Sequence, residues 1–355
     1  MRAGLAVSDL AVRLGTFRLG ALDFAIEAGE TLVILGPNGA GKSVSLETIA
    51  GFHRPERGEV RIGGREVTRL PPERRKVAFV FQNFGLFPHL TVAGNIRLAL
   101  NARRRGDRSR QLEELLARLE IAPLAGRGPG FLSPGEKQRV ALARALAAEP
   151  NLFLFDEPFS ALDAATRDRL RGELSSFLRR EGIPAIFVTH DFADALGLAD
   201  RIAVMRAGRI EQEGPAQRVF RAPATRFVAE FLGVENILPG RCESAGRITV
   251  ANVPLATSAP EPQLEPGSPV LLCIRAEDVE LEPKENQDRI LARVLEVTHE
   301  GILARLALDC GFPLIARTMR KEVERLGLAP GCEIALALPP QAIQVIANPR
   351  EGRGQ

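Results

Sequence analysis

Short, continuous apolar segments recur along the first two thirds of the chain, at residues 32–35, 77–81, 152–155 and 184–188. Runs this short, without alternation of polar and apolar positions, are typical of parallel strands that are buried on both faces of a sheet. Residues 43–51 follow the first run and have the spacing of a helix. After about residue 234, short apolar segments are broken by Pro and Gly, as in small all-β modules. The pattern predicts an α/β domain followed by a β domain.

Two stretches of the second part resemble each other at an offset of 64 residues. They are 264–281, LEPGSPVLLCIRAEDVEL, and 328–345, LAPGCEIALALPPQAIQV. Each reads Leu-x-Pro-Gly, then an alternating strand, a turn and a second strand. We expect a tandem pair of small β-barrel modules over about residues 238–348.

Composition narrows the class of protein. A chain of 355 residues is long enough for two domains, and 45% hydrophobic with 26% charged residues is typical of a globular protein with a full core. A net charge of +3 is too small to indicate nucleic acid or an anionic membrane as a partner. The second part also lacks the aromatic platform and basic groove on which bases stack. With no signal-peptide pattern and no apolar stretch long enough to span a membrane, we expect a cytoplasmic chain.

The cysteines all lie in the last third of the chain. Their spacing contains no Cys-x-x-Cys pair and does not match a metal site. We therefore expect buried, reduced thiols, which pack as small hydrophobic side chains. They are Cys242, Cys273, Cys310 and Cys332.

A glycine-rich loop follows the first apolar run and matches the pattern G-x-x-x-x-G-K-[ST] of a P-loop. Glycines let the backbone approach phosphate oxygens closely, and the N–H groups at a helix start favour anions. The lysine reaches the β- and γ-phosphates and the serine hydroxyl ligates Mg²⁺. The expected nucleotide-binding residues are Gly36, Pro37, Asn38, Gly39, Ala40, Gly41, Lys42 and Ser43.

Three further apolar runs end in polar side chains suited to the same chemistry. Asp156 closes one run and is placed to hold Mg²⁺, while Glu157 is placed to polarise a water for attack on the γ-phosphate. His190 follows another run, at the same sheet edge if the strands are parallel, where an imidazole can hold the γ-phosphate and the attacking water. The amide of Gln82 is a further expected Mg²⁺ ligand and γ-phosphate sensor.

The stretch Ser-Pro-Gly-Glu at 133–136 has the pattern of a helix start. Ser133 fits the N-cap and Glu136 the third helical position, which is the spacing of a capping box. Pro134 falls at the first helical position, where its fixed φ suits a helix and its missing N–H costs little. The small tip leaves room for a phosphate at the helix dipole.

The motif order of P-loop, Gln82, LSPGE, LFLFDEPFSALD and VTHD resembles the ATP-binding subunit of an ABC transporter over roughly residues 1–232. The resemblance implies a P-loop NTPase domain at 1–233 with a helical subdomain at about 88–150. It further implies a regulatory β domain at 234–350, with two oligonucleotide-binding-like repeats of about 64 residues. ATP and Mg²⁺ are the implied cofactors, Glu157 the catalytic base and His190 the switch histidine.

The same resemblance implies a homodimer that sandwiches ATP. The N-terminus of the 133–136 helix would grip the γ-phosphate of ATP held by the partner chain, through Ser133, Gly135 and Glu136. Residues 160–163, ending in Asp163, would cross the dimer interface. Pro134 stands where the family usually has Gly and removes one backbone donor, so the grip either survives on a stiffer helix start or is weakened. The dimer would sit at the cytoplasmic face of the membrane, bound to two transmembrane permease subunits and served by a solute-binding protein.

Two assignments stay open in the sequence. The family's adenine-stacking aromatic lies upstream of the P-loop, where this chain has no Tyr, and Phe17 is either that aromatic or an ordinary core residue. An oxyanion at the C-terminal domain is also open. Thr318 and Arg320 are either its contacts or solvated residues, and Pro339 and Pro340 stand where such domains often carry a lysine.

The transported solute is also inferred by resemblance. The stretches RLGTFRL, GKSVSLETIAGF and LDCGFPLIARTMRKEVERLGLAPG resemble molybdate/tungstate importer ATPases most. Sulfate, iron(III) and polyamine remain alternatives. A soluble ABC ATPase is the less favoured class, because this chain has one P-loop and no coiled-coil or zinc insertion. An intact set of motifs disfavours a regulator with a vestigial ATPase.

Overall fold

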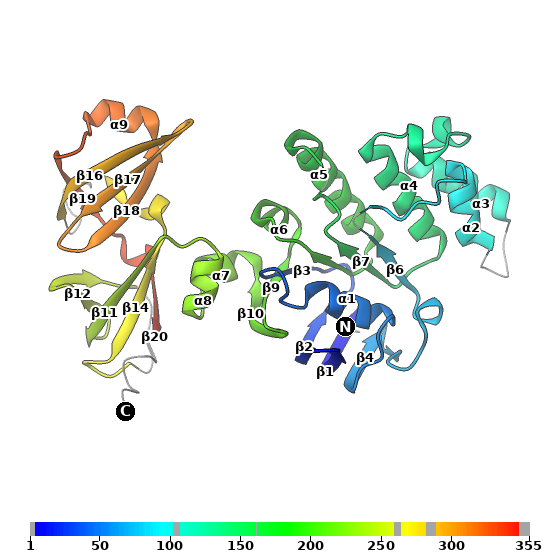
Figure 1. The fold of residues 1–355 in the computed structure, drawn as a ribbon, viewed down its shortest axis with the longest axis horizontal. Coiled ribbons are helices and arrows are strands. Elements are labelled where there is room, and N and C mark those ends of the chain that lie inside the picture. Colours follow the sequence, from blue (N-terminus) through cyan, green and yellow to red (C-terminus); the bar gives the residue numbers. More distant parts are fainter. Residues whose placement is uncertain are drawn as a thin grey trace. The chain divides into compact units, whose positions relative to one another are not determined.

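The computed structural model describes residues 4–81, 83–101, 107–160, 162–258, 264–281 and 289–347. The chain divides into two compact units, Met1–Gln217 and Arg218–Gln355. The first is an α/β unit with a helical part, and the second is built mainly of β-strands (Figure 1). This confirms the predicted fold class. No helix in the described part of the chain is long and apolar enough to cross a membrane.

A six-stranded sheet forms the centre of the first unit, in the order β10-β9-β3-β8-β7-β6. β3 pairs in parallel with β8 and β9, β7 pairs in parallel with β6 and β8, and β10 is antiparallel to β9. Every residue of β3 and β8 is buried, as the apolar runs predict. The strands are β3 (Thr31–Leu35), β6 (Val77–Val80), β7 (Leu152–Asp156), β8 (Ala185–Val188), β9 (Arg201–Arg206) and β10 (Arg209–Pro215).

A second, antiparallel sheet in the order β2-β1-β4-β5 shares a hydrophobic core with one face of the central sheet. Helix α1 (Lys42–Ala50) contributes Leu46 and Ile49 to this core, next to Leu32, Leu154 and Ile186 of the central strands. The position of α1 is therefore fixed by both sheets. The antiparallel strands are β1 (Leu5–Leu14), β2 (Phe17–Ile26), β4 (Arg57–Ile62) and β5 (Arg65–Glu66).

Helices cover the other side of the central sheet. Phe153 of β7 contacts Phe177 of α5 edge to face at 6.4 Å, and Phe155 stacks on Phe187 of β8 at 4.3 Å. The helical part, predicted at about 88–150, contains α2, α3 and α4. The helices are α2 (Val92–Asn101), α3 (Arg108–Arg118), α4 (Pro134–Ala147), α5 (Ala164–Glu181) and α6 (Phe192–Leu198), with 3₁₀ turns at Pro72–Arg74, Ala122–Leu124 and Pro129–Phe131.

The second unit contains two five-stranded sheets whose inner faces form one core. The first has the order β13-β12-β11-β14-β20 and the second the order β15-β19-β16-β17-β18. The strands of the first sheet are β11 (Asn236–Ser244), β12 (Arg247–Val250), β13 (Val253–Ala256), β14 (Pro269–Ile274) and β20 (Ile343–Ala347). Those of the second are β15 (Glu280–Leu281), β16 (Ile290–Glu300), β17 (Leu303–Asp309), β18 (Pro313–Met319) and β19 (Glu333–Ala337).

The two repeats take the same local form but exchange their second strands. The first repeat supplies β14, the 3₁₀ turn η4 (Ala276–Asp278) and β15, and the second supplies β19, η5 (Pro340–Ala342) and β20. β14 pairs with β20, and β15 pairs with β19. Each sheet therefore contains one strand from each repeat, so the repeats are interlocked rather than folded as two separate barrels in tandem.

Short helices complete the second unit. α8 (Arg226–Phe231) places Ala229 against Leu271 and Cys273 on the outer face of β14, which is why β14 is buried on both faces instead of alternating as expected. α9 (Arg320–Leu326) follows β18, and α7 (Ala216–Arg221) spans the division between the units.

The four cysteines are free, and all but Cys332, which is half-buried, are buried. Burial raises the pKa of the thiols of Cys273 and Cys310 to about 12. These thiols stay protonated at neutral pH, as expected of cysteines that serve as small core residues.

Candidate functional site

The loop between β3 and α1 wraps around its own lysine. The Lys42 ammonium donates to the carbonyl oxygens of Gly36 at 2.8 Å and Pro37 at 3.1 Å. Its side chain is buried, and this burial lowers its pKa against the opposing charges of Glu157 and Asp156. The ammonium is thus held inside the loop. In a P-loop, this lysine contacts the β- and γ-phosphates of the bound nucleotide.

Glycine is required at two positions in this loop because a Cβ there would lie too close to atoms of neighbouring strands. Gly41, the N-cap of α1, has φ +101°, and a Cβ there would lie 2.7 Å from Cζ of Phe17. A Cβ on Gly36 would lie 2.4 Å from the carbonyl oxygen of Met205 on β9. The loop is further tied to the β9–β10 turn, since the Gly208 N–H donates to the Ala40 carbonyl at 2.8 Å.

Strands β3, β7 and β8 end at one edge of the sheet and bring the polar side chains together. Asp156 lies opposite Val188 in the parallel register, which confirms that their strands end side by side. The Ser43 hydroxyl at the start of α1 donates to Oδ1 of Asp156 at 3.0 Å. Burial raises the pKa of Asp156, and the hydrogen bond from Ser43 opposes that rise. The Ser43 hydroxyl and the Asp156 carboxylate are therefore close enough to bind one Mg²⁺ ion together, since Mg²⁺ is a hard cation that prefers oxygen ligands.

Glu157 and His190 meet at the same edge. Nδ1 of His190 lies 3.2 Å from Oε1 of Glu157, with the histidine side chain 59% exposed and the glutamate 25% exposed. β8 ends at Val188, at the end of the apolar run and two residues before His190, where the Thr189 hydroxyl accepts from the Asp191 N–H and begins a polar turn. A carboxylate paired with an imidazole beside solvent is an arrangement suited to moving a proton.

A cleft of about 390 Å³ adjoins the loop. Phe17, at the start of β2, lines it and also packs against the hydrophobic core behind it. Both readings of Phe17 are therefore compatible with its position. The remaining lining residues are 38–44 and Glu157, so the cleft connects the loop with the Glu157–His190 pair.

The start of α4 has the predicted cap. The Ser133 hydroxyl accepts from the Glu136 N–H at 3.3 Å, and the Glu136 carboxylate accepts from the Ser133 N–H at 2.7 Å. Pro134 is the first helical residue. These hydrogen bonds from Ser133 hold the pKa of Glu136 below its usual range. The capping box predicted from the sequence is confirmed.

Gly135 and Asp163 connect this region with α5. A Cβ on Gly135 would lie 3.2 Å from Cδ2 of Leu170, so α4 and α5 approach closely at this glycine. Asp163 is the N-cap of α5, and the hydrogen bond its side chain accepts from the Thr166 N–H lowers its pKa. The structure thus places Ser133, Gly135, Glu136 and Asp163 at two helix starts, and it does not bring them together with the loop at 36–43 through any contact among the described residues.

Comparison with known proteins decides the family. Residues 19–160 match the ABC transporter family model. The chain is 41% identical over 355 residues to the sulfate/thiosulfate import ATP-binding protein CysA 2 of Chromobacterium violaceum, covering 98% of this chain and 96% of that one. It is 44% identical over 279 residues to the molybdate/tungstate import ATP-binding protein WtpC of Thermococcus kodakarensis, covering 78% and 83%.

The chain belongs to the ABC transporter ATP-binding proteins of the importer type. Among solved structures, it resembles a dimeric post-hydrolysis state of the ATP-binding cassette MJ0796 bound to ADP and Pi. That likeness has a TM-score of 0.52 at 31% identity and covers 60% of this chain and 98% of that one. Proteins of this family bind ATP with Mg²⁺ and hydrolyse it, and this confirms the predicted cofactors and enzyme class.

One predicted residue of this importer ATPase is not described by the structure, and one further residue of the region was missed in the sequence. Gln82 lies outside the described residues, so its predicted role stays a prediction. Arg144 of α4 was missed, although its guanidinium donates to the carbonyl oxygens of Gly85 at 2.6 Å and Phe84 at 3.1 Å. Burial lowers the pKa of this guanidinium. The signal available in the sequence was one arginine within the apolar run 140–147 of α4.

Proposed function

We propose that this chain hydrolyses ATP to energise uptake of a small oxyanion, with molybdate or tungstate as the first candidate. The stretches that resemble molybdate/tungstate importer ATPases support this solute, as does the similarity to a relative named for it. Sulfate or thiosulfate is the nearest alternative, because these anions have the same tetrahedral form and another relative is named for their import. Iron(III) and polyamines are the further alternatives, and one relative is named for spermidine/putrescine import.

The proposed roles follow from the contacts at the sheet edge. Lys42 and the backbone N–H groups of residues 36–43 hold the β- and γ-phosphates, and Phe17 stacks on the adenine. Ser43 and Asp156 hold Mg²⁺, joined by Gln82. The ion neutralises charge on the phosphates when it is bound. The remaining roles at this edge, proton transfer and orientation of the attacking water, belong to protein side chains.

The 3.2 Å approach of His190 to Glu157 is the observation that carries the catalytic assignment. Glu157 takes a proton from the attacking water, and His190 orients that water and the γ-phosphate. We expect Glu157→Gln to lower ATP turnover by about 100-fold or more, since a general base contributes about 10²–10⁴-fold. ATP affinity, read from a fluorescent analogue, is expected to persist.

A matched control is Glu173→Gln on the exposed part of α5, which also neutralises one carboxylate. It is expected to keep full turnover. Unchanged turnover in Glu157→Gln would remove Glu157 from the role of base. Loss of nucleotide binding in the same variant would show that the carboxylate supports the site instead of the chemistry.

The start of α4 is the proposed contact to the ATP that the partner chain binds. We propose a homodimer in which Ser133, Gly135 and Glu136 contact the γ-phosphate bound by the partner, with Asp163 at the interface. The intact capping box supports the reading that Pro134 stiffens the helix start without abolishing the grip. Pro134→Gly is then expected to leave turnover nearly unchanged. A several-fold gain would show that proline weakens the ATP sandwich.

An exposed aromatic patch suits contact with the permease. Phe52, Phe81 and Phe87 are 49%, 42% and 39% exposed, and Phe52 stacks on Phe81 at 6.4 Å. Arg144 lies over the Phe87 ring and holds the preceding backbone. We propose this patch as the docking surface for the permease subunits at the cytoplasmic face of the membrane. Phe81→Ser is expected to reduce permease-stimulated turnover and to spare basal turnover.

The solute is tested with the permease and the solute-binding protein present. Turnover is measured with and without molybdate, tungstate or sulfate, and stimulation by one of them identifies the oxyanion. A response to none of them, with basal turnover still abolished in Glu157→Gln, would retain the ATPase and discard the oxyanion. Oxyanion control through the C-terminal unit stays a prediction, and at Arg320 the anion would compete with Glu324, which accepts from that guanidinium at 2.9 Å.

A further inference from the structure

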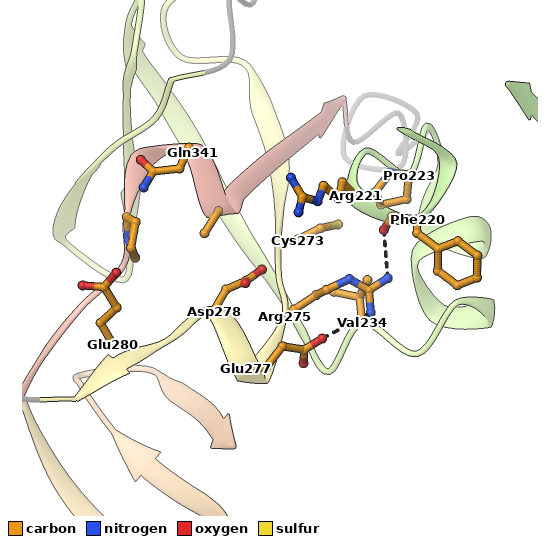
Figure 2. A pocket seen from close by; sticks show the side chains of 12 residues that line it. Phe220, Arg221, Pro223, Val234, Cys273, Arg275, Glu277, Asp278, Glu280 and Gln341 are labelled. Atoms are coloured by element: carbon orange, nitrogen blue, oxygen red, sulfur yellow. Dashed lines mark hydrogen bonds and ion pairs between the residues drawn. The ribbon is translucent and has the colours of Figure 1, made fainter. Parts of the chain in front are cut away.

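The two equivalent turns of the repeats face a common pocket in the second unit. At the offset of 64 residues, Arg275, Glu277 and Asp278 correspond to Pro339, Gln341 and Ala342. All six residues line one cavity of about 310 Å³ (Figure 2). The exchange of strands between the repeats explains this, because it brings η4 and η5 to the same end of the unit.

The pocket is charged on only one of its two related sides. The turn of the first repeat carries three charged side chains, and the related turn of the second repeat carries none. Arg221 at the end of α7 and Glu280 of β15 add one charge of each sign. The wall thus has two guanidiniums and three carboxylates. A net negative wall disfavours a free oxyanion and favours a ligand that carries a cationic group.

Part of this charge already has a structural use. The Arg275 guanidinium donates to the Phe220 carbonyl at 2.8 Å and lies 3.8 Å from the Glu277 carboxylate (Figure 2). The hydrogen bond ties the end of α7 to η4, and the ion pair joins two neighbouring residues of the pocket wall. We therefore assign Arg275 and Glu277 to the scaffold.

Arg221 and Asp278 remain available to a ligand. Within the described residues, neither side chain forms a hydrogen bond or an ion pair within 4.0 Å, although both line the same cavity. Opposite charges that share a pocket without touching leave room for a molecule with a complementary charge for each of them. Val234, Pro223 and the buried, protonated Cys273 thiol contribute apolar surface to the wall.

We infer that this pocket binds a small zwitterion of the α-amino acid class, with its carboxylate on Arg221 and its ammonium on Asp278. The Gln341 amide can donate to or accept from either group. A cavity of about 310 Å³ suits a ligand of this size, since ligand pockets begin at about 300 Å³. The inference is independent of the proposed importer role, because it concerns only the binding of a ligand to this pocket.

The test uses the full chain without ATP or permease. Each standard amino acid is screened by saturation-transfer difference NMR, and the one with the strongest signal is titrated by calorimetry. We expect Arg221→Ala and Asp278→Asn each to weaken its affinity by about tenfold or more, because a hydrogen bond to a charged group contributes about 1.5–3 kcal/mol. Arg218→Ala, a neighbouring exposed arginine outside the pocket, is expected to leave the affinity unchanged.

Three outcomes would overturn the inference. The first is the absence of a signal from every amino acid, and the second is an affinity that both pocket variants leave intact. The third is binding of sulfate or molybdate in an Arg221-dependent way without any amino acid competing, which would make the site an oxyanion site. Thermal unfolding of Arg221→Ala and of the charge-retaining Arg221→Lys shows whether a loss of binding reflects a loss of fold.

Discussion

Replacing Gly41 with alanine tests how the P-loop is shaped. The residue has φ +101°, a conformation that L side chains rarely adopt, so an alanine there is strained by about 1–3 kcal/mol. In addition, its Cβ would lie 2.7 Å from Cζ of Phe17 and 3.1 Å from Cδ1 of Leu19. Overpacking of this kind costs about 1–3 kcal/mol. We expect Gly41→Ala to lower the free energy of unfolding by about 2–6 kcal/mol.

Gly39 allows the backbone strain to be measured separately from the steric clash of the Cβ. It also has positive φ, at +77°, but a Cβ there meets nothing within 4 Å, so Gly39→Ala carries the backbone strain alone. Urea unfolding of the nucleotide-free chain should therefore rank Gly41→Ala below Gly39→Ala. Removing the ring with Phe17→Ala should make the Gly41→Ala substitution less costly, as a double-mutant cycle detects. Equal losses for the two glycines, or no coupling with Phe17, would refute the proposed contact.

Three further substitutions probe separate parts of the site. Ser133→Ala removes the cap of α4 and is expected to cost about 1 kcal/mol in urea unfolding, with no loss for Ser176→Ala at an exposed position of α5. Arg144→Lys keeps the charge but cannot reach both carbonyls, so a loss of about 1–2 kcal/mol is expected, and a stability equal to the parent would contradict the role of Arg144 as an anchor. Because the pKa of Asp156 is raised in the fold, its charge costs stability as pH rises above the ordinary value of 3.8. Asp156→Asn should therefore stabilise the nucleotide-free chain at neutral pH and have little effect below about pH 3.8 in pH-dependent unfolding.

The parts of the site that local sequence determines were predictable. The spacing of glycines around Lys42, the burial of β7 and the capping box at Ser133 each depend on residues that are close together in the chain. Parallel pairing of β7 with β8 was also accessible, because short apolar runs separated by helices leave few other arrangements. The apolar run also gives the end of β8 at Val188, and the polar turn that the Thr189 hydroxyl begins after it depends on a local contact as well.

Contacts between distant segments were not predictable in the same way. The pattern of strand, turn and strand in each repeat is identical whether β14 pairs within its own repeat or with β20, so only the fold shows the exchange. The anchoring of residues 84–85 by Arg144 spans about 60 positions in the chain and depends on where a long side chain reaches. Neither feature leaves a periodic signal.

The backbone of Glu157 connects the fold with the proposed chemistry. This residue has φ +47°, although it is not glycine, and such a conformation costs about 1–3 kcal/mol. Its N–H donates to the Val188 carbonyl at 2.9 Å, and its own carbonyl accepts from the Ser160 hydroxyl at 2.9 Å. If β7 simply continued, alternation would direct the side chain after Asp156 toward the same side as the buried Phe155. The turn held by Val188 and Ser160 instead brings the Glu157 carboxylate to His190. The backbone strain is therefore located at the residue whose carboxylate has to point away from the core and toward solvent to accept a proton from water.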